Sequence, residues 1–168
     1  MILHCTKKLA AKLPEVSATL LEETSPLGSW HAHLHHIDRR QCVFFCHDAT
    51  RYVLFLPGLK KEQFMELGRW HKELFIACLA YDGISDAQVR RAELALGPVR
   101  FDTATDRSVQ SSMRVAMWDL LAHIERIPNV MLGNPLSMNV RVNERPATVR
   151  GKLVWPKRAM AELVASLR

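Results

Sequence analysis

The chain has 168 residues, of which 48% are hydrophobic and 24% are charged. This composition is ordinary for a globular protein, excludes a disordered one and predicts a single domain over residues 1–168. The net charge of +6 favours an acidic partner, such as nucleic acid, over a basic one.

The first residues show none of the basic, apolar and small-residue regions that make up a signal peptide. No run approaches the roughly 18 apolar residues that span a membrane. The cysteines lie in apolar segments and form no Cys-x-x-Cys pair, so we expect buried thiols of a reducing compartment. These cysteines are Cys5, Cys42, Cys46 and Cys78. The sequence therefore predicts a cytoplasmic protein without membrane contact.

The segment over residues 1–57 is predicted to be rich in β-strands, beginning with the apolar run 2–5. A helix over 7–13 is expected next, because the Thr6 hydroxyl can accept a hydrogen bond from a free N–H of its first turn. The polar residues 15–28 are expected to form a loop.

Strict alternation of apolar and polar residues over 30–35 predicts the next strand. Two further apolar runs, 42–47 and 52–56, follow after short polar turns. Short turns join neighbouring antiparallel strands. We therefore expect a three-stranded meander that ends at Pro57 and Gly58.

Helices are expected to dominate residues 59–127. Apolar residues at helical spacing predict a long helix over 59–81, and Gly83 suits the left-handed conformation that closes a helix. Three shorter elements are expected to follow in order, namely helix 85–96, strand 99–101 and helix 107–127.

The remaining residues, 130–168, are predicted to form a basic segment of mixed structure. Residues 139–142 and 152–154 are expected to be edge strands, and Pro156 suits the first turn of a last helix over 157–167. From residue 139 onward, seven Lys and Arg residues stand against two Glu residues, so most of the net positive charge lies here.

Strands precede helices along the chain, an order typical of the α+β class. The expected architecture is an N-terminal antiparallel β-meander packed against several α-helices. No internal repeat or linker divides the chain, which again favours one domain.

Five short motifs stand out along the chain. They are Met1-Ile2-x-x-Cys5-Thr6-Lys7-Lys8-Leu9, Trp30-His31-Ala32, Asp38-Arg39-Arg40, Asp48-x-Thr50-Arg51 and Thr105-Asp106-Arg107-Ser108-Val109-x-Ser111-Ser112-Met113. Together they resemble a bacterial family of domains of unknown function, some of whose members lie near plasmid or other mobile-element genes. The chain departs from the family pattern at His47, where Asn is expected, and near Ser111 and Arg114. The resemblance reaches about residue 135 and implies a bacterial domain, without any established catalytic residue.

Alternate histidines mark the first strand of the meander and project from one of its faces. If the hairpin turns through a two-residue loop at Arg39-Arg40, His33 lies opposite Cys46 and His31 lies opposite Asp48. Imidazole, thiolate and carboxylate are zinc ligands, so His31, His33, Cys46 and Asp48 form a candidate metal site. The plainer interpretation is a half-solvated sheet face, because three ligands on one strand span about 13 Å.

Two groups of residues are candidate anion sites. Asp106 or Thr105 is a natural N-cap of the helix that follows. The free N–H groups of its first turn, together with Arg107, can hold a phosphate. The plainer interpretation is a helix cap with an ion pair between Arg107 and a carboxylate. In the basic C-terminal segment Trp155 can stack on a base, although a solvated edge with Trp155 packed inward is the alternative. The candidate residues are Arg107, Ser108, Arg114, Arg141, Arg145, Arg150, Lys152 and Trp155.

The sequence contains no Gly-rich phosphate loop, no His-Glu-x-x-His and no Gly-x-Ser-x-Gly pattern. His4 and Cys5 are strand neighbours that point to opposite faces, so they cannot pair directly. We therefore expect a binding or regulatory module without a cofactor, which engages nucleic acid or an acidic protein surface. The alternatives are a small metal-assisted hydrolase or nuclease that uses the histidine-rich strand, and a protein that acts only within a complex.

Overall fold

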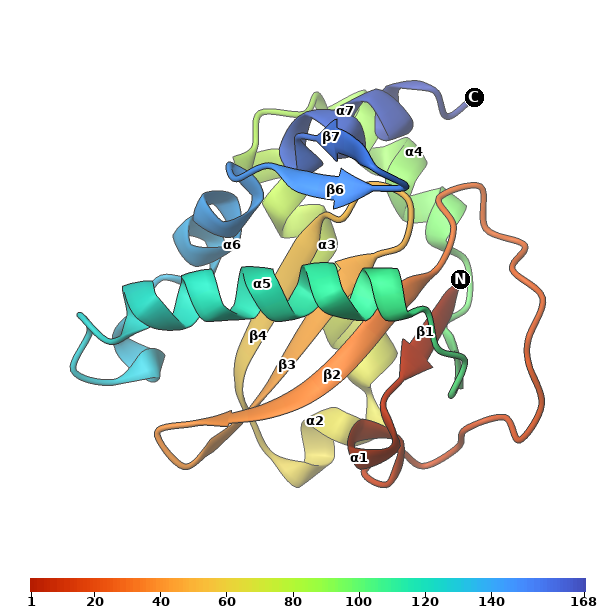
Figure 1. Ribbon diagram of the computed structural model, residues 1–168. Coiled ribbons are helices and arrows are strands. Elements are labelled where there is room, and N and C mark those ends of the chain that lie inside the picture. The colour runs from red at the N-terminus through yellow and green to blue at the C-terminus, as the bar shows by residue number, and fades with distance from the viewer.

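The computed structural model describes residues 1–168 and contains a mixed five-stranded sheet with helices on both faces (Figure 1). Strand β1 is parallel to its two neighbours β2 and β5, while β2, β3 and β4 form an antiparallel meander. The strand order is β4-β3-β2-β1-β5, with β1 at Ile2–Cys5, β2 at Trp30–Ile37, β3 at Arg40–His47, β4 at Val53–Leu59 and β5 at Arg100–Asp102. The expected α+β class and the meander are confirmed.

The register of the β2–β3 hairpin differs from the expected one. Asp38 and Arg39 form the two-residue turn, with φ angles of 49° and 60° that suit a type I′ turn. His31 therefore lies opposite Cys46, and His33 lies opposite Phe44. The expectation that His33 faces Cys46 was wrong, because it placed the turn one residue too late.

Strand β4 does not end at Pro57 and Gly58, as the sequence suggested, but continues to Leu59. Its pairing with β3 shifts register between Gln41 and Val43, and an edge strand accommodates a proline at such an irregularity. The long helix expected next is broken at Glu66. Its two parts are α2 (Lys61–Met65) and α3 (Leu67–Tyr81).

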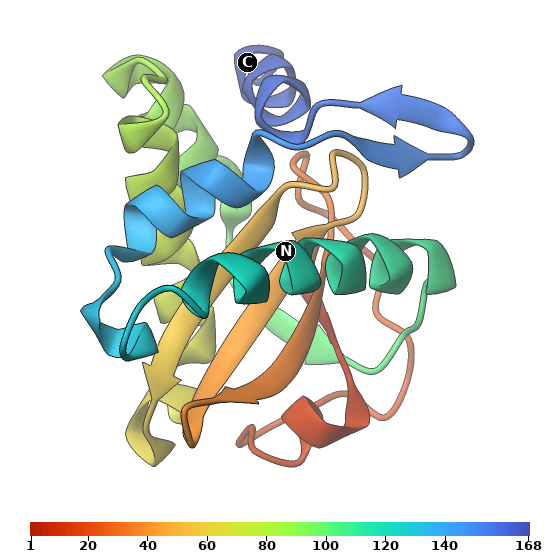
Figure 2. The ribbon, with the colours of Figure 1, turned by 60° about the vertical axis from the view of Figure 1, so that its left-hand side comes forward.

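Helices cover the two faces of the sheet unequally (Figures 1 and 2). On one face the larger core packs strand residues such as Trp30 and Phe45 against Phe75 of α3. On the other face a smaller core packs Phe44 and Phe55 beneath Leu120 of α5. The larger core includes residues of α1 (Lys7–Ala10), α4 (Asp86–Leu96) and α7 (Pro156–Ala165), and the smaller core those of α5 (Arg107–Ile124), η1 (Val130–Leu132) and α6 (Pro135–Asn143).

Some helix boundaries carry the signals that the sequence suggested. Gly83 has φ of 85° after α3, as expected, and Pro156 begins α7. Helix α1 is shorter than predicted, and Thr6 does not cap it, because the Thr6 hydroxyl has no hydrogen-bond partner. None of the helices combines the length and apolar character needed to cross a membrane.

Residues 139–142, expected to be an edge strand, belong to α6 instead. Asn139 and Asn143 lie one helical turn apart and are fully buried. Asn139 Oδ1 accepts from the Phe55 N–H at 2.6 Å, and its Nδ2 donates to the Phe55 carbonyl at 3.1 Å. Asn143 forms the same two bonds with Val53, both at 2.7 Å. Two side chains thus satisfy the outer edge of β4 as a further strand would.

His71 of α3 lies at the centre of the larger core and is 0% exposed. Its ring packs against Trp30 and Phe45, with centroids 4.7 Å and 4.8 Å away. Neither ring nitrogen has a hydrogen-bond partner. Burial lowers the pKa of His71 to about 3, so the imidazole is neutral near pH 7.

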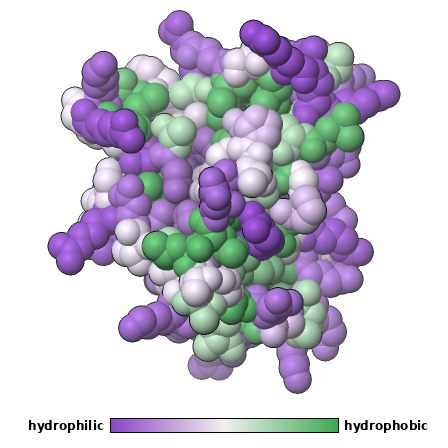
Figure 3. Space-filling model, turned by 90° about the vertical axis from the view of Figure 1, so that its right-hand side faces the viewer, coloured by the Kyte–Doolittle hydropathy of each residue, from purple (hydrophilic) through white to green (hydrophobic).

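Strands β6 (Ala147–Val149) and β7 (Lys152–Val154) form a separate antiparallel ribbon that projects beside α7 (Figure 2). The ribbon confirms the strand expected at residues 152–154. Figure 3 shows the face of the molecule that lies on the right in Figure 1, where apolar side chains gather in several patches separated by hydrophilic ones. The ribbon and the N-terminal half of α5 frame the polar region described next.

Candidate functional site

Strands β1, β2 and β5, the β3–β4 turn and the start of α5 bring together a cluster of histidines and aspartates. In this cluster, the imidazole of His31 is 4% exposed, and its Nε2 accepts a hydrogen bond from the Asp106 backbone N–H at 2.9 Å. The hydrogen of His31 must therefore be on Nδ1, which donates to Asp48 Oδ1 at 2.8 Å. Both ring nitrogens of His31 are thus engaged.

His4 forms a second pair beside the first, and the rings of His4 and His31 are 4.9 Å apart. Its Nδ1 lies 2.6 Å from Oδ1 of Asp102, a carboxylate that is 1% exposed. Burial opposes the ionisation of Asp102, but hydrogen bonds from His4 and from the backbone at 104 and 21 outweigh it and lower its pKa. Asp102 is therefore ionised and orients His4, whose Nε2 faces Asp48 Oδ2 at 3.9 Å.

A buried arginine joins this cluster to the adjoining groove. Arg51 is 4% exposed and has a φ of 60°. One of its terminal nitrogens donates to the Asp48 carbonyl oxygen, and the other donates to Ser108 Oγ at 3.1 Å. Its Nε is buried without any hydrogen-bond partner. An unpaired donor on a buried cation is costly, so Arg51 stands out as an incompletely hydrogen-bonded cation in the wall of the groove.

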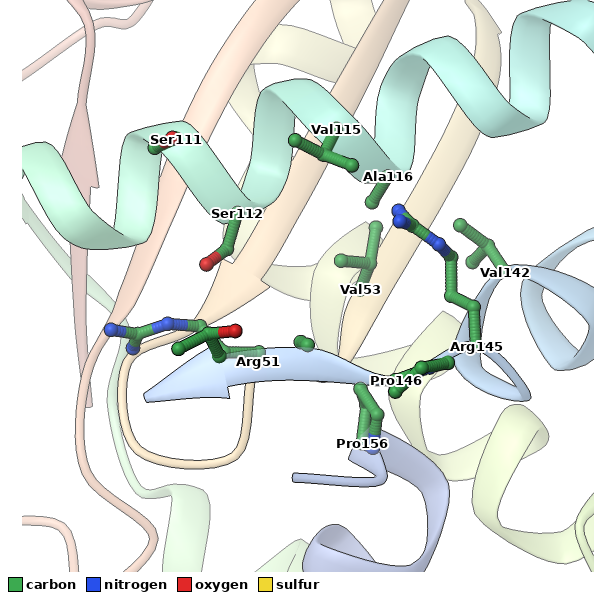
Figure 4. A pocket seen from close by; sticks show the side chains of 12 residues that line it. Arg51, Val53, Ser111, Ser112, Val115, Ala116, Val142, Arg145, Pro146 and Pro156 are labelled. Carbon is green, nitrogen blue, oxygen red and sulfur yellow. The ribbon is translucent and has the colours of Figure 1, made fainter. Parts of the chain in front are cut away.

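The groove is a cavity of about 300 Å³ between α5 and the β6–β7 ribbon (Figure 4). Figure 4 shows Arg51 and Arg145 at opposite ends of it, and Ser112 pointing from α5 towards the ribbon. Arg145 lies 3.7 Å from the exposed Asp119 carboxylate. The remaining lining mixes hydroxyls with apolar side chains and includes Ser111, Thr148, Val53, Val115 and Val142. Two cations and several hydroxyls around a cavity suit an anionic ligand.

The beginning of α5 is already capped. Asp106, and not Thr105, is the cap, and its carboxylate accepts from the N–H groups of Ser108 and Val109. These bonds lower the pKa of Asp106, so a negative charge occupies the place where the sequence suggested a phosphate. Arg107 is exposed and forms no ion pair, so the expected Arg107–carboxylate pair is absent.

The other basic candidates fall into separate places. Arg145 lines the groove, whereas Arg114 lines a smaller cavity of about 170 Å³ with His33 and Thr6. Trp155 is 50% exposed and does not pack inward. Three cations are exposed on α6 and on the ribbon, namely Arg141, Arg150 and Lys152. The structure thus brings Ser108 into contact with Arg51 and places Arg145 at the other end of the same groove, but scatters the rest.

The four candidate metal ligands do not surround one point. Among these four side chains, the one hydrogen bond joins His31 to Asp48. His33 lines the smaller cavity, where burial and then the charges of neighbouring His35, Lys8 and Arg114 lower its pKa. Cys46 is fully buried, which raises its thiol pKa to about 12. No group of three or more His, Cys, Asp or Glu side chains is arranged to hold a metal ion.

Sequence reasoning missed His4, Asp102 and Arg51 as site residues. His4 and Asp102 are 98 positions apart and meet only because β5 pairs in parallel with β1. Arg51 gave a usable signal, because it closes the Asp48-x-Thr50-Arg51 motif at a turn.

The fold and these contacts define a small α+β domain with a histidine–aspartate cluster beside an arginine-lined groove. Comparison with known proteins then identifies the family. The chain belongs to a family described as a domain of unknown function (DUF6933), whose sequence model matches residues 2–159. No curated protein and no solved structure gives a significant match. The expected resemblance to a family without a known activity is confirmed at this level.

Proposed function

We propose that this domain is a binding module for a phosphate-bearing ligand, and that the ligand is a single-stranded nucleic acid. The observation that carries the proposal is Arg51, a buried guanidinium that lines the groove with its Nε unpartnered. A phosphate in the groove would lie beside this incompletely paired guanidinium, and charge-assisted bonds between such groups are about twice as strong as neutral ones.

The surroundings of the groove support a chain-like ligand. Arg145 provides a second cation at the far end, and Ser112 provides a hydroxyl between them. Outside the groove, Arg150 and Lys152 extend the positive charge along the ribbon, and the half-exposed Trp155 offers a surface for base stacking. Successive phosphates could therefore follow the ribbon after the first enters the groove.

The proposed setting is the cytoplasm of a bacterium. Four cysteine thiols are free and buried, which agrees with a reducing compartment. The net charge of +6 favours association with nucleic acid there.

The test is fluorescence anisotropy with labelled twelve-nucleotide single strands of RNA and DNA over a salt series. We expect log affinity to fall linearly with log salt concentration, because phosphate contacts release counterions. Ser112→Leu, which narrows the groove, and Arg145→Gln should each weaken binding at least about fivefold, as expected for loss of about 1 kcal/mol. Arg90→Gln, at an exposed position of α4 on the opposite face of the sheet, removes the same charge as Arg145→Gln and should leave binding nearly unchanged.

Absence of binding even at low salt would refute the nucleic-acid proposal. Equal weakening by Arg90→Gln and Arg145→Gln would show that overall charge, and not the groove, is responsible. Polyglutamate that binds in the groove while oligonucleotides do not would assign the site to an acidic protein surface instead.

A further inference from the structure

We infer that the histidine–aspartate cluster is a hydrolytic site, in which His4 Nε2 and Asp48 Oδ2 hold an attacking water. The inference goes beyond binding, and it rests on the proposed function only for its substrate class, a phosphoester of the ligand. No metal ion enters the step.

The hydrogen bonds of the cluster fix His4 as a base. Asp102 is ionised and accepts the hydrogen of His4 Nδ1 at 2.6 Å. In the neutral ring this leaves the lone pair on Nε2, which faces away from Asp102. A buried carboxylate that orients imidazole in this manner also stabilises the imidazolium formed after proton uptake. The His4 side chain is 13% exposed, so the ring is held by its surroundings yet accessible at its edge.

Asp48 supplies the second acceptor. Its Oδ1 is occupied by His31 Nδ1–H, and the tautomer of His31 is fixed in turn by the Asp106 N–H. Its Oδ2 has no hydrogen-bond donor, and the side chain is 30% exposed. The structure thus leaves one free acceptor on each of two neighbouring groups, His4 and Asp48.

The distance between these acceptors matches a water that donates to both. Nε2 and Oδ2 are 3.9 Å apart, too far for a direct hydrogen bond. A water oxygen about 2.8 Å from each atom fits between them and directs its lone pairs outward. Hydrogen bonding to both acceptors orients the water and increases its nucleophilicity.

Charged and titratable groups of the cluster come from every element around this position. They are the carboxylates of Asp48, Asp102 and Asp106, the imidazoles of His4 and His31, and the guanidinium of Arg51. Arg51 contacts the Asp48 carbonyl on one side and lines the groove on the other. A phosphate held by Arg51 is therefore placed on the cluster's side of the groove.

The step balances without a further reagent. One water proton moves to His4 Nε2, and the water oxygen forms a bond to phosphorus. The bond from phosphorus to the ester oxygen breaks on the side opposite the attacking water, where that oxygen takes a proton from solvent water, and His4 Nε2 afterwards releases its proton to solvent. His4 is then neutral again, and the products of a phosphodiester are a phosphomonoester and an alcohol.

The experiment measures hydrolysis of bis(p-nitrophenyl) phosphate and of the labelled oligonucleotides. His4→Asn keeps a donor towards Asp102 but has no base, so kcat should fall about 10²–10⁴-fold while anisotropy still reports oligonucleotide binding. In His4→Ala, added imidazole should restore part of the activity. Asp102→Asn, a positioning change, should lower kcat with KM unchanged. His36→Ala, at an exposed position of β2, is the matched control and should retain full activity.

Each outcome decides between the two proposals. Oligonucleotide binding without hydrolysis of either probe overturns the hydrolytic site and leaves the binding function standing. Hydrolysis that survives in a folded His4→Asn protein overturns it as well. Hydrolysis that depends on His4 but is insensitive to Ser112→Leu supports the hydrolytic site and refutes the groove as the binding site.

Discussion

Replacing His71 by leucine should make the protein more resistant to mild acid. The imidazole is fully buried in the larger core, and burial lowers its pKa from 6.5 to about 3. Below pH 6.5 the unfolded chain binds a proton at this residue that the folded chain does not bind until about pH 3. The stability linked to His71 is therefore complete above pH 6.5 and is lost as the pH falls towards 3.

The magnitude follows from the pKa difference. Each pH unit between the two pKa values changes the free energy of unfolding by about 1.4 kcal/mol per proton. From pH 7 to pH 5, wild type should lose about 2 kcal/mol through His71 alone, because about 1.5 of those units lie below the unfolded pKa. Burial also lowers the pKa of His47, so the total loss in wild type is larger. The difference between wild type and His71→Leu isolates the His71 contribution.

Urea unfolding at pH 7, 6 and 5, followed by tryptophan fluorescence, measures this difference. Leucine fits the apolar surroundings and leaves no unpaired ring nitrogen, so we expect His71→Leu to fold. His36→Gln, at an exposed position, is the control and should follow wild type. If His71→Leu loses as much stability as wild type between pH 7 and pH 5, the buried-imidazole explanation is refuted.

Two further predictions test the packing of the sheet. Asn139→Leu should lower the free energy of unfolding by about 2–4 kcal/mol in a urea titration, because both backbone groups of Phe55 lose their partner inside the protein; unchanged stability would contradict the bonds described. Native protein should react very slowly with Ellman's reagent at pH 8, whereas four thiols should react in concentrated urea. We expect this because all four cysteines are buried, and burial raises the pKa of their thiols. Rapid labelling of the native protein would contradict this prediction.

Much of the fold can be predicted from the sequence because its signals are local. Alternation over residues 30–35 identifies β2, and the Asp106 cap marks the start of α5. The hairpin register was not predictable to one residue, since moving the turn by one position changes every pairing across β2 and β3. A four-residue pattern such as 139–142 cannot distinguish a strand from a helix, because Val142 is buried in either.

The candidate site was harder to predict, because its pairs depend on long-range contacts. The sequence suggested that His31 and Asp48 lie together, and they are hydrogen-bonded, but it predicted them as metal ligands and through a register that does not occur. His4 meets Asp102 only through the parallel pairing of β1 with β5. No periodicity in the sequence indicates this strand pairing. Arg51 was missed for a different reason, because the excess of positive charge in the C-terminal segment favoured a basic site there.

The two asparagines of α6 also limit how copies of this protein can associate. A carboxamide presents one donor and one acceptor side by side, as a peptide group does, so Asn139 and Asn143 leave β4 with no bonds to offer at Phe55 and Val53. A strand from another molecule could pair there only after α6 had detached. Edge-to-edge joining of sheets, a common first step in aggregation, is therefore blocked at this border by a barrier of local unfolding.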